Sequence, residues 1–230
     1  VKMEVVRDHP PKKGFLESIR NITKKKNIVL IFDECTSGFR ETNSGIYKKY
    51  NVVPDMCIFG KALGNGYAIN AIVGKEKIMN SINNTFISST FWTEKIGSVA
   101  AIKTLEIMNK EKPWKKITKT GLYVKSKWKK LFEKYDFKYE ITGFSAIPKF
   151  NFLNKNNLKY RTFITQEFLK KKILGTNTIY LSIKHDKTQL EEYFYYLDKI
   201  LEKLKIAEDK GAIDQSLETR VISQSFQRLN

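Results

Sequence analysis

The chain has 230 residues and a formal net charge of +18, from 42 lysines and arginines and 24 aspartates and glutamates. This length suffices for a buried core in one or two domains, and no run of 18 apolar residues predicts a membrane segment or membrane partner. No secretion signal is recognisable, and the two cysteines, Cys35 and Cys57, predict a reducing, cytoplasmic location rather than a disulfide framework.

The first residues predict a strand, a loop and a helix. Residues 1–6 are apolar enough for a strand, and they start in mid-strand without an initiator methionine, so we expect a fragment of a longer protein. His9 stands beside two prolines, where we expect a structural or exposed histidine. Apolar residues then recur at helical spacing and predict a helix that covers one face of a sheet: Phe15, Leu16, Ile19 and Ile22.

Two apolar strands that end in charged residues organise the chain. Residues 28–32 form a continuous apolar run, typical of a fully buried parallel strand, and Asp33 follows it. Residues 56–59 form a second run, which Gly60 and Lys61 follow. Open α/β sheets bind ligands outside the carboxyl ends of their strands. We therefore expect Asp33 and Lys61 to face one crevice.

A third strand and a long helix follow. Residues 67–74 predict an apolar strand, and residues 96–108 predict a helix that ends before Pro113. The segment before this helix is rich in hydroxyl and aromatic side chains. Its Thr90 has two interpretations from local sequence alone: a helix cap or turn residue, or part of an anion site at the helix start.

The last part of the chain predicts an α+β unit. A helix containing Trp128 is followed by two short strands (139–141 and 147–152), a helix (162–173), a strand (178–183) and a long helix (190–204). Asp186 and Gln189 resemble a capping box for the last helix. His185, just before it, is expected to be structural. We predict domains at 1–112 and 113–205, with residues 206–230 as a tail ordered only by packing. No Cys/His cluster with the spacing of metal ligands occurs.

Three segments carry a resemblance to a known family: Asp33 to Arg40, Pro54 to Lys61, and residues 88–94. Together they resemble the core of a class III pyridoxal-phosphate-dependent aminotransferase, closest to the glutamate-1-semialdehyde aminomutase branch. The 28-residue interval from Asp33 to Lys61 also matches that family. The resemblance covers nearly the whole chain and corresponds to the carboxyl-terminal part of the enzyme.

The resemblance implies an α/β fold of the fold-type I PLP-transferase kind. We expect a partial large domain with a mostly parallel sheet, and a small α+β carboxyl-terminal domain. Family members also carry an amino-terminal half, which holds the main phosphate loop and the aromatic residue that stacks on the cofactor ring. The family has a Glu-Pro pair at the place of Glu4, where this chain has Val5 instead of the proline.

The resemblance also implies a role for individual residues around pyridoxal 5'-phosphate. Lys61 would form the Schiff base and act as the general acid and base of amino-group transfer. Asp33 would pair with the pyridine nitrogen, Cys35 would lie against one face of the ring, and Thr36 would lie near the phenolic oxygen. Thr90 would reach the cofactor phosphate of the other subunit.

The implied function is transamination or aminomutation between a small amino donor and a carbonyl acceptor, in a homodimer with its active site at the subunit interface. Without the resemblance, Lys61 would be read as a surface charge and Asp33 as a strand-end acid. Two alternatives remain: a family member that has lost catalysis, and a basic nucleic-acid-binding module. The lysines are dispersed along the chain and arginines are few, which favours solvated helix faces over a nucleic-acid surface.

Overall fold

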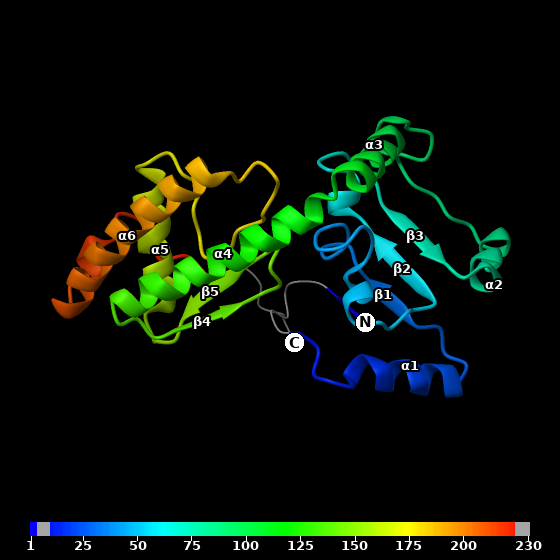
Figure 1. The fold of residues 1–230 in the computed structure, drawn as a ribbon, viewed down its shortest axis with the longest axis horizontal. Helices are drawn as coiled ribbons and strands as arrows, with labels where there is room; N and C mark the ends of the chain where they lie inside the picture. The colour runs from blue at the N-terminus through cyan, green and yellow to red at the C-terminus, as the bar shows by residue number, and fades with distance from the viewer. Residues whose placement is uncertain (4–9, 224–230) are drawn as a thin grey trace. The chain divides into compact units, whose positions relative to one another are not determined.

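The computed structural model describes residues 1–3 and 10–223, which form two compact units divided between Thr118 and Lys119. The positions of Glu4 and His9, for which a strand end and a loop were expected, lie outside the described residues. Figure 1 shows the elements of each unit. Among the described helices, none combines the length and apolar character that crossing a bilayer requires.

The first unit is built on a three-stranded mixed sheet (Figure 1). Strand β1 (Ile31–Asp33) runs parallel to β2 (Met56–Phe59), and β2 pairs antiparallel with β3 (Ala71–Gly74). Residues 1–3 lie along the free side of β1, where Lys2 forms a parallel bridge with Asp33. The two apolar runs that predicted β1 and β2 therefore form neighbouring parallel strands.

One face of this sheet carries the core of the first unit. Helix α1 (Phe15–Lys25) contributes Leu16 to a buried cluster, and Ile19 packs against the same cluster. The buried members are Leu16, Leu30, Phe32, Val52, Cys57, Phe59, Leu63 and Ala101. The amphipathic pattern of α1 thus predicted the packing of Leu16 and Ile19 correctly, whereas Phe15 and Ile22 of the same pattern are exposed.

The other face of β1 is exposed, which differs from the fully buried strand expected for residues 28–32. Phe32 is completely buried, whereas Ile31 is exposed and Ile28 retains 53% of its accessible surface. Successive side chains of a strand point to opposite faces, and in the described residues only one face is covered by α1 and its neighbours. A continuous apolar run therefore did not mean burial on both faces here.

Two further helices complete the first unit, α2 (Glu76–Met79) and α3 (Ile96–Glu111). Helix α3 ends at Lys112, which has a left-handed backbone with φ 50°, and Pro113 then opens α4 (Pro113–Lys134). Proline is favoured at the first position of a helix because its missing N–H has no partner there. Short 3-10 helices occupy Ile46–Lys49, Lys61–Leu63 and Asn80–Asn84.

The second unit packs helices α4, α5 (Asn157–Leu169) and α6 (Lys187–Asp209) with an antiparallel hairpin (Figure 1). The hairpin consists of β4 (Tyr139–Thr142) and β5 (Lys149–Phe152). Val124, Trp128 and Phe132 recur every four residues on α4 and are fully buried. The rings of Trp128 and Phe132 each contact the ring of Phe150 at 4.9 Å between centroids. The predicted α+β composition of this region is present.

Two elements of the second unit differ from their predictions. Helix α5 starts at Asn157 rather than near Thr162. Residues 178–183 form no regular strand: Thr178 makes an isolated bridge with Lys149, and the Leu181 N–H donates to the Ala146 carbonyl at 3.0 Å. The N–H of Ile179 donates to the carbonyl of Pro148 at 3.1 Å. Proline has no N–H to return that bond, so the ladder is broken at this point.

The entry and exit of α6 are fixed by side chains. The Asp186 carboxylate accepts a hydrogen bond from the Gln189 N–H at 3.0 Å, which confirms the predicted cap. The ring Nδ1 of His185 accepts a bond from the Ser182 N–H, as expected for a structural histidine. After α6, the carbonyl of Ser216 accepts a bond from the Gln166 amide of α5, so this segment packs against α5.

Candidate active site

The parallel pairing of β1 and β2 brings Asp33 and Lys61 to the same edge of the sheet. The register places Asp33 opposite Ile58, and β2 ends one residue later at Phe59. Lys61 follows after a single glycine and opens a short 3-10 helix. The carboxyl ends of parallel strands form the edge where α/β folds bind ligands. The carboxylate and the amine therefore both start from this edge.

Lys61 is held in an unusual conformation. Its φ is 43°, in the left-handed region that residues with a side chain seldom adopt. Its Nζ donates a hydrogen bond of 2.6 Å to the Thr36 hydroxyl. The preceding Gly60 approaches the segment before β3 so closely that a Cβ there would lie 2.3 Å from the Asn70 Oδ1. A side chain at position 60 would therefore have to displace the Asn70 amide, and the turn directs the Lys61 side chain to the turn after β1.

Asp33 is fixed by its backbone and by one bond to its carboxylate. Its N–H donates to the Val1 carbonyl and its carbonyl accepts from the Met3 N–H, both at 2.9 Å. The Cys35 N–H donates to Oδ1 at 3.1 Å. The side chain is only partly buried. A carboxylate held in this way keeps its second oxygen for another partner.

The turn after Asp33 presents the other two residues of the predicted site. Thr36 retains only 3% of its accessible surface, and its carbonyl accepts a bond of 2.6 Å from the Arg40 Nε. Cys35 is partly buried, with Sγ 3.7 Å from the place of a Cβ on Gly60. The structure therefore brings Asp33, Cys35, Thr36 and Lys61 together, and Arg40 supports the turn that carries them.

Both cysteines are free thiols, and their surroundings differ. Cys57 points into the core from β2, where burial, together with the nearby charge of Glu34, raises the pKa of its thiol to about 12. A thiol with so high a pKa is protonated at neutral pH and unreactive. Of the two cysteines, only Cys35 stands at the sheet edge.

Thr90 lies elsewhere in the first unit, in an exposed turn before α3. In this turn the Ser89 hydroxyl accepts a bond from the Phe91 N–H, and the Glu94 carboxylate accepts one from the Ile96 N–H at the start of α3. Ser89 and Glu94, rather than Thr90, therefore provide the side-chain acceptors for the N–H groups of Phe91 and Ile96. Within residues 1–3 and 10–223, no hydrogen bond joins Thr90 to Asp33, Thr36 or Lys61.

Glu34 is a buried acid at this edge that the sequence did not single out. Its side chain is completely buried and accepts three hydrogen bonds, from the Ser37 hydroxyl at 2.5 Å and from the N–H groups of Ile46 and Tyr47 at 3.0 Å. Burial raises the pKa of this carboxyl, and the three donors oppose the rise. Its position directly after Asp33 was the only sequence signal, because two of its three partners, Ile46 and Tyr47, lie 12 and 13 residues further along the chain.

Asp55 is a second acid whose role emerges only from the fold. Its carboxylate accepts hydrogen bonds from the Leu30 N–H at 2.9 Å, from Arg20 of α1 at 2.9 Å and from Lys75 after β3 at 2.7 Å. Burial disfavours its charge, but the bonds from Lys75, Leu30 and Arg20 outweigh burial and lower the pKa of Asp55 to about 2. Asp55 therefore ties α1, β1 and β3 to the start of β2.

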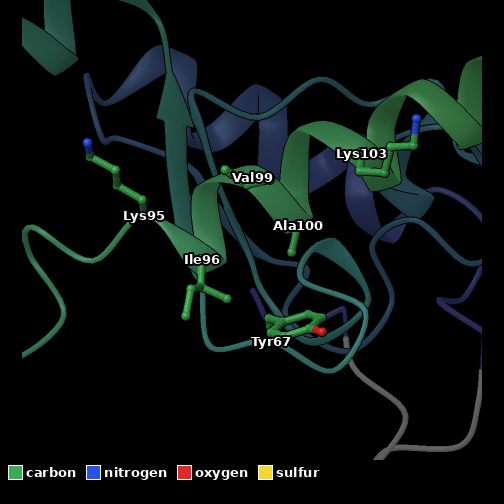
Figure 2. Close-up of a pocket in the computed structure, with 6 residues that line it drawn as sticks. All are labelled: Tyr67, Lys95, Ile96, Val99, Ala100 and Lys103. Atoms are coloured by element: carbon green, nitrogen blue, oxygen red, sulfur yellow. The ribbon is translucent and has the colours of Figure 1, made fainter.

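An open pocket of about 350 Å³ lies at the start of α3 (Figure 2). Its lining residues are Tyr67, Lys95, Ile96, Val99, Ala100 and Lys103. The lining is mostly apolar, and neither Asp33 nor Lys61 belongs to it. This pocket is therefore distinct from the arrangement of charged groups at the sheet edge.

Comparison with known proteins places this chain in a family. The family described as Aminotransferase class-III matches residues 8–200. A 3-aminobutyryl-CoA aminotransferase of Cloacimonas acidaminovorans is 36% identical over 159 residues, which are 69% of this chain and 38% of that protein. The glutamate-1-semialdehyde 2,1-aminomutase 2 of Lachnoclostridium phytofermentans is 32% identical over 157 residues, covering 66% of this chain and 37% of that protein.

Solved structures agree with the expected fold. The FumI protein of Sphingopyxis sp. MTA144, solved in its PLP internal aldimine form, superposes with a TM-score of 0.80 at 20% identity, over 85% of this chain and 48% of that one. An omega-transaminase of Sphaerobacter thermophilus gives a TM-score of 0.75 at 19% identity, over 84% of this chain and 48% of that one. The predicted partial fold-type I architecture is confirmed, and the chain spans less than half of the length of the two curated relatives. Because the family match covers most of the sequence, this chain belongs to the class III aminotransferase family, as its resemblance predicted.

Proposed function

We propose that this chain carries the reactive lysine and the ring-binding acid of a PLP-dependent transaminase or aminomutase. The observation that carries the proposal is the bond of 2.6 Å from Lys61 Nζ to the Thr36 hydroxyl, beside the strand end that presents Asp33. The names of its relatives, an aminotransferase and an aminomutase, support the same reaction class. The substrates are a small amino donor and a carbonyl acceptor.

The residues at the sheet edge match the chemistry of pyridoxal phosphate. Lys61 offers an amine for an aldehyde, Asp33 a carboxylate for a basic ring nitrogen, and Thr36 a hydroxyl for a phenolic oxygen. Cys35 offers a small, weakly polar side chain against a ring face. When bound, the cofactor supplies an aldehyde that takes up amines and a ring that withdraws electrons from the neighbouring substrate carbon.

Lys61 has two tasks in this proposal. Its Nζ is the amine that would hold the cofactor, and the same amine would serve as the general acid and base that moves a proton at the reacting carbons. The Thr36 hydroxyl accepts a bond from Nζ and thereby limits where the amine can point. Orientation of this kind lowers the entropic cost of each proton transfer.

Asp33 acts through its charge. A carboxylate next to the ring nitrogen favours the protonated form of that nitrogen, because opposite charges stabilise each other. The Cys35 N–H fixes one oxygen of Asp33 at 3.1 Å, which orients the carboxylate without neutralising it. Asp33 would thereby favour a proton on the ring nitrogen of a bound cofactor.

We assign Thr90 to the cofactor phosphate of a second subunit and propose that the protein is a homodimer. Thr90 is exposed, and its surroundings present apolar side chains to solvent: Phe86 with 94% of its surface accessible, Trp92, and Val99 on α3 with 64%. Large exposed apolar patches mark protein interfaces. Contact with a second subunit would cover these side chains and bring Thr90 to a neighbouring site.

We further assign residues 1–112 to the cofactor-binding large domain, residues 113–205 to a small domain and the remainder to a tail. The sheet edge with Asp33 and Lys61 belongs to the first of these ranges, and the hairpin β4–β5 with α5 and most of α6 to the second. A cytoplasmic location is part of the proposal, supported by the free thiols of Cys35 and Cys57.

Internal ion pairs weaken the case for a nucleic-acid-binding module. Glu167 of α5 pairs with Lys170 at 2.5 Å and Lys203 at 3.0 Å, and Lys205 pairs with Glu208 at 3.0 Å. Lysines engaged in this way contribute less to a phosphate-binding surface. If the protein bound nucleic acid, its affinity for nucleic acid would fall steeply as the salt concentration rises. An affinity that does not change with salt concentration would exclude that alternative.

The requirement for an external amino donor tests the reaction class. The protein, supplied with pyridoxal phosphate, is assayed for turnover of an amino aldehyde with and without an added amino acid. An aminomutase turns over without the donor and a transaminase only with it. Loss of turnover in Lys61→Ala supports the proposal, whereas turnover that survives this substitution contradicts it.

A further inference from the structure

The carboxylate of Glu34 joins the two halves of the loop that follows β1. It accepts bonds from Ser37 in the first half and from the N–H groups of Ile46 and Tyr47 in the second. The Glu34 backbone takes part as well, since its N–H donates to the Ile58 carbonyl of β2 and its carbonyl accepts from the Gly38 N–H, both at 2.8 Å. Glu34 is therefore the centre of the loop rather than a passive neighbour of Asp33.

The loop is shaped to leave room for this carboxylate. A Cβ at Gly45 would lie 2.7 Å from the Glu34 Oε1, and a Cβ at Gly38 would lie 2.8 Å from the Glu34 carbonyl and 2.6 Å from the Phe59 ring. All three distances are shorter than a real Cβ atom tolerates. The two glycines thus allow the backbone to close around Glu34, which packs the loop against β2.

We propose that Glu34 is a positioning residue that holds Thr36 in place and, through the Thr36 hydroxyl, sets the direction of the Lys61 amine. Thr36 lies between Glu34 and its partner Ser37 in the same turn, and its hydroxyl accepts the bond from Lys61 Nζ at 2.6 Å. The path from Glu34 to Lys61 therefore consists of one turn and one hydrogen bond. The inference concerns Lys61 itself and rests on the proposed function only for its catalytic consequence.

The energetics favour a positioning role for a buried acid with three donors. Hydrogen bonds to a charged acceptor are stronger than neutral ones, and leaving a buried N–H without an acceptor is costly. A glutamine at position 34 has the same size but only one oxygen. Its NH₂ group would face Ile46 N–H or Tyr47 N–H, so at least one of these donors would lose its acceptor.

The test compares Glu34→Gln with Glu41→Gln, without added cofactor. Glu41 is a buried acid of the same loop, and its carboxylate is contacted by Lys49 from the 3-10 helix. Two quantities are measured on the folded proteins: amide hydrogen exchange at Ile46 and Tyr47, and the rate at which an acylating reagent labels Lys61. Thr36→Val serves as the reference for a Lys61 amine released from its hydroxyl partner.

We expect Glu34→Gln to speed exchange at one or both amides by about tenfold or more. We also expect it to change Lys61 labelling in the same direction as Thr36→Val, while Glu41→Gln leaves labelling at the wild-type rate. Wild-type labelling in Glu34→Gln overturns the proposal, and so does an equal change in Glu41→Gln. If Glu34→Gln does not fold, Ser37→Ala removes one donor and keeps the charge, and unchanged Lys61 labelling in that variant overturns the proposal.

The labelling experiment and the amino-transfer assay can fail independently of each other. A protein that fails to transfer amino groups can still show the labelling change, which would leave Glu34 as a positioning residue for Lys61. A protein that transfers amino groups but shows wild-type labelling in Glu34→Gln and Ser37→Ala keeps its function and loses this inference.

Discussion

The amine of Lys61 donates a hydrogen bond of 2.6 Å to the hydroxyl of Thr36, although 25 residues separate the two in the chain. The parallel pairing of β1 with β2 makes this contact possible, because it sets the turn after Asp33 beside the turn after Phe59. Thr36 is buried whereas Lys61 is exposed. A fixed acceptor therefore restrains a side chain that solvent would otherwise leave mobile.

Removing the acceptor should impair catalysis without unfolding the protein. Thr36→Val keeps the shape of the side chain and deletes the hydroxyl that Lys61 contacts. A hydrogen bond to a charged group contributes about 1.5–3 kcal/mol, so we expect kcat/KM to fall about tenfold or more. Thr36→Ser retains a hydroxyl and should restore most of the loss. Equal activities for Thr36→Val and wild type would show that this bond does not matter for turnover.

The charge of Asp33 should matter more than its shape. Asp33→Asn keeps an oxygen that can accept the Cys35 N–H, so the turn should remain folded. It removes the negative charge opposite the ring nitrogen, and a fall in kcat of about 100-fold is expected for the loss of one such electrostatic group. Steady-state kinetics, with circular dichroism to verify folding, checks this. Near-wild-type kcat in a folded Asp33→Asn protein would refute the assigned role.

The Asp55 carboxylate should stabilise the first unit at neutral pH and lose this effect in strong acid. Its pKa is about 2 in the folded protein and 3.8 in its unperturbed state, so its contribution is complete above about pH 4 and is lost as the pH falls towards 2. Near neutral pH, Asp55→Asn should lower the free energy of unfolding by about 2 kcal/mol. Urea unfolding at pH 7 and pH 2.5 measures both values, and the difference between variant and wild type should shrink at the lower pH.

The exposed acid Glu106 provides the control for Asp55. It pairs with Lys103 at 3.0 Å, and 58% of its side-chain surface is accessible. An exposed pair of this kind contributes about 0.2–1 kcal/mol, so Glu106→Gln should change stability by less than Asp55→Asn at pH 7. Equal losses for the two variants would contradict the special position of Asp55.

Gly121 should be intolerant of any side chain despite its place in the middle of a helix. A Cβ at this position of α4 would lie 1.7 Å from the Ser145 carbonyl oxygen. Alanine raises helix propensity by about 1 kcal/mol relative to glycine, but overpacking against backbone costs about 1–3 kcal/mol. Thermal unfolding should therefore show a net loss for Gly121→Ala. Ser126→Ala, at an exposed position of the same helix, should be neutral, and a more stable Gly121→Ala would contradict the close approach.

The sequence was most informative where an apolar run is followed directly by charged residues or glycine, because such a run predicts both a strand and the place where it ends. An apolar run that ends in Asp33, and another that ends in Gly60 and Lys61, predicted β1 and β2 and the edge they share. The helix predicted around Trp128 is likewise present as α4. These signals are local, and the family resemblance then supplied the roles that the residues alone left open.

The sequence was least informative where a residue's partners lie far away in the chain. Glu34 and Asp55 bind backbone N–H groups and side chains from distant elements, and no spacing rule predicts such contacts. The start of α5 was predicted about five residues too late. Most of its residues from Tyr160 to Phe168 are buried, so the helix has no regular alternation of polar and apolar faces to mark where it begins. The strand predicted at 178–183 does not form because its neighbour in the structure is Pro148, which has no N–H to donate. The sequence does not show that these two segments lie side by side.

The identity of the lysine that binds the cofactor tests the central claim most directly. The protein is incubated with pyridoxal phosphate, reduced with borohydride, digested and analysed by mass spectrometry, in parallel with Lys61→Ala. We expect the modification to concentrate on Lys61 in the wild-type protein and to be lost from the variant. A modification spread evenly over the surface lysines, or retained in full by Lys61→Ala, would contradict the account.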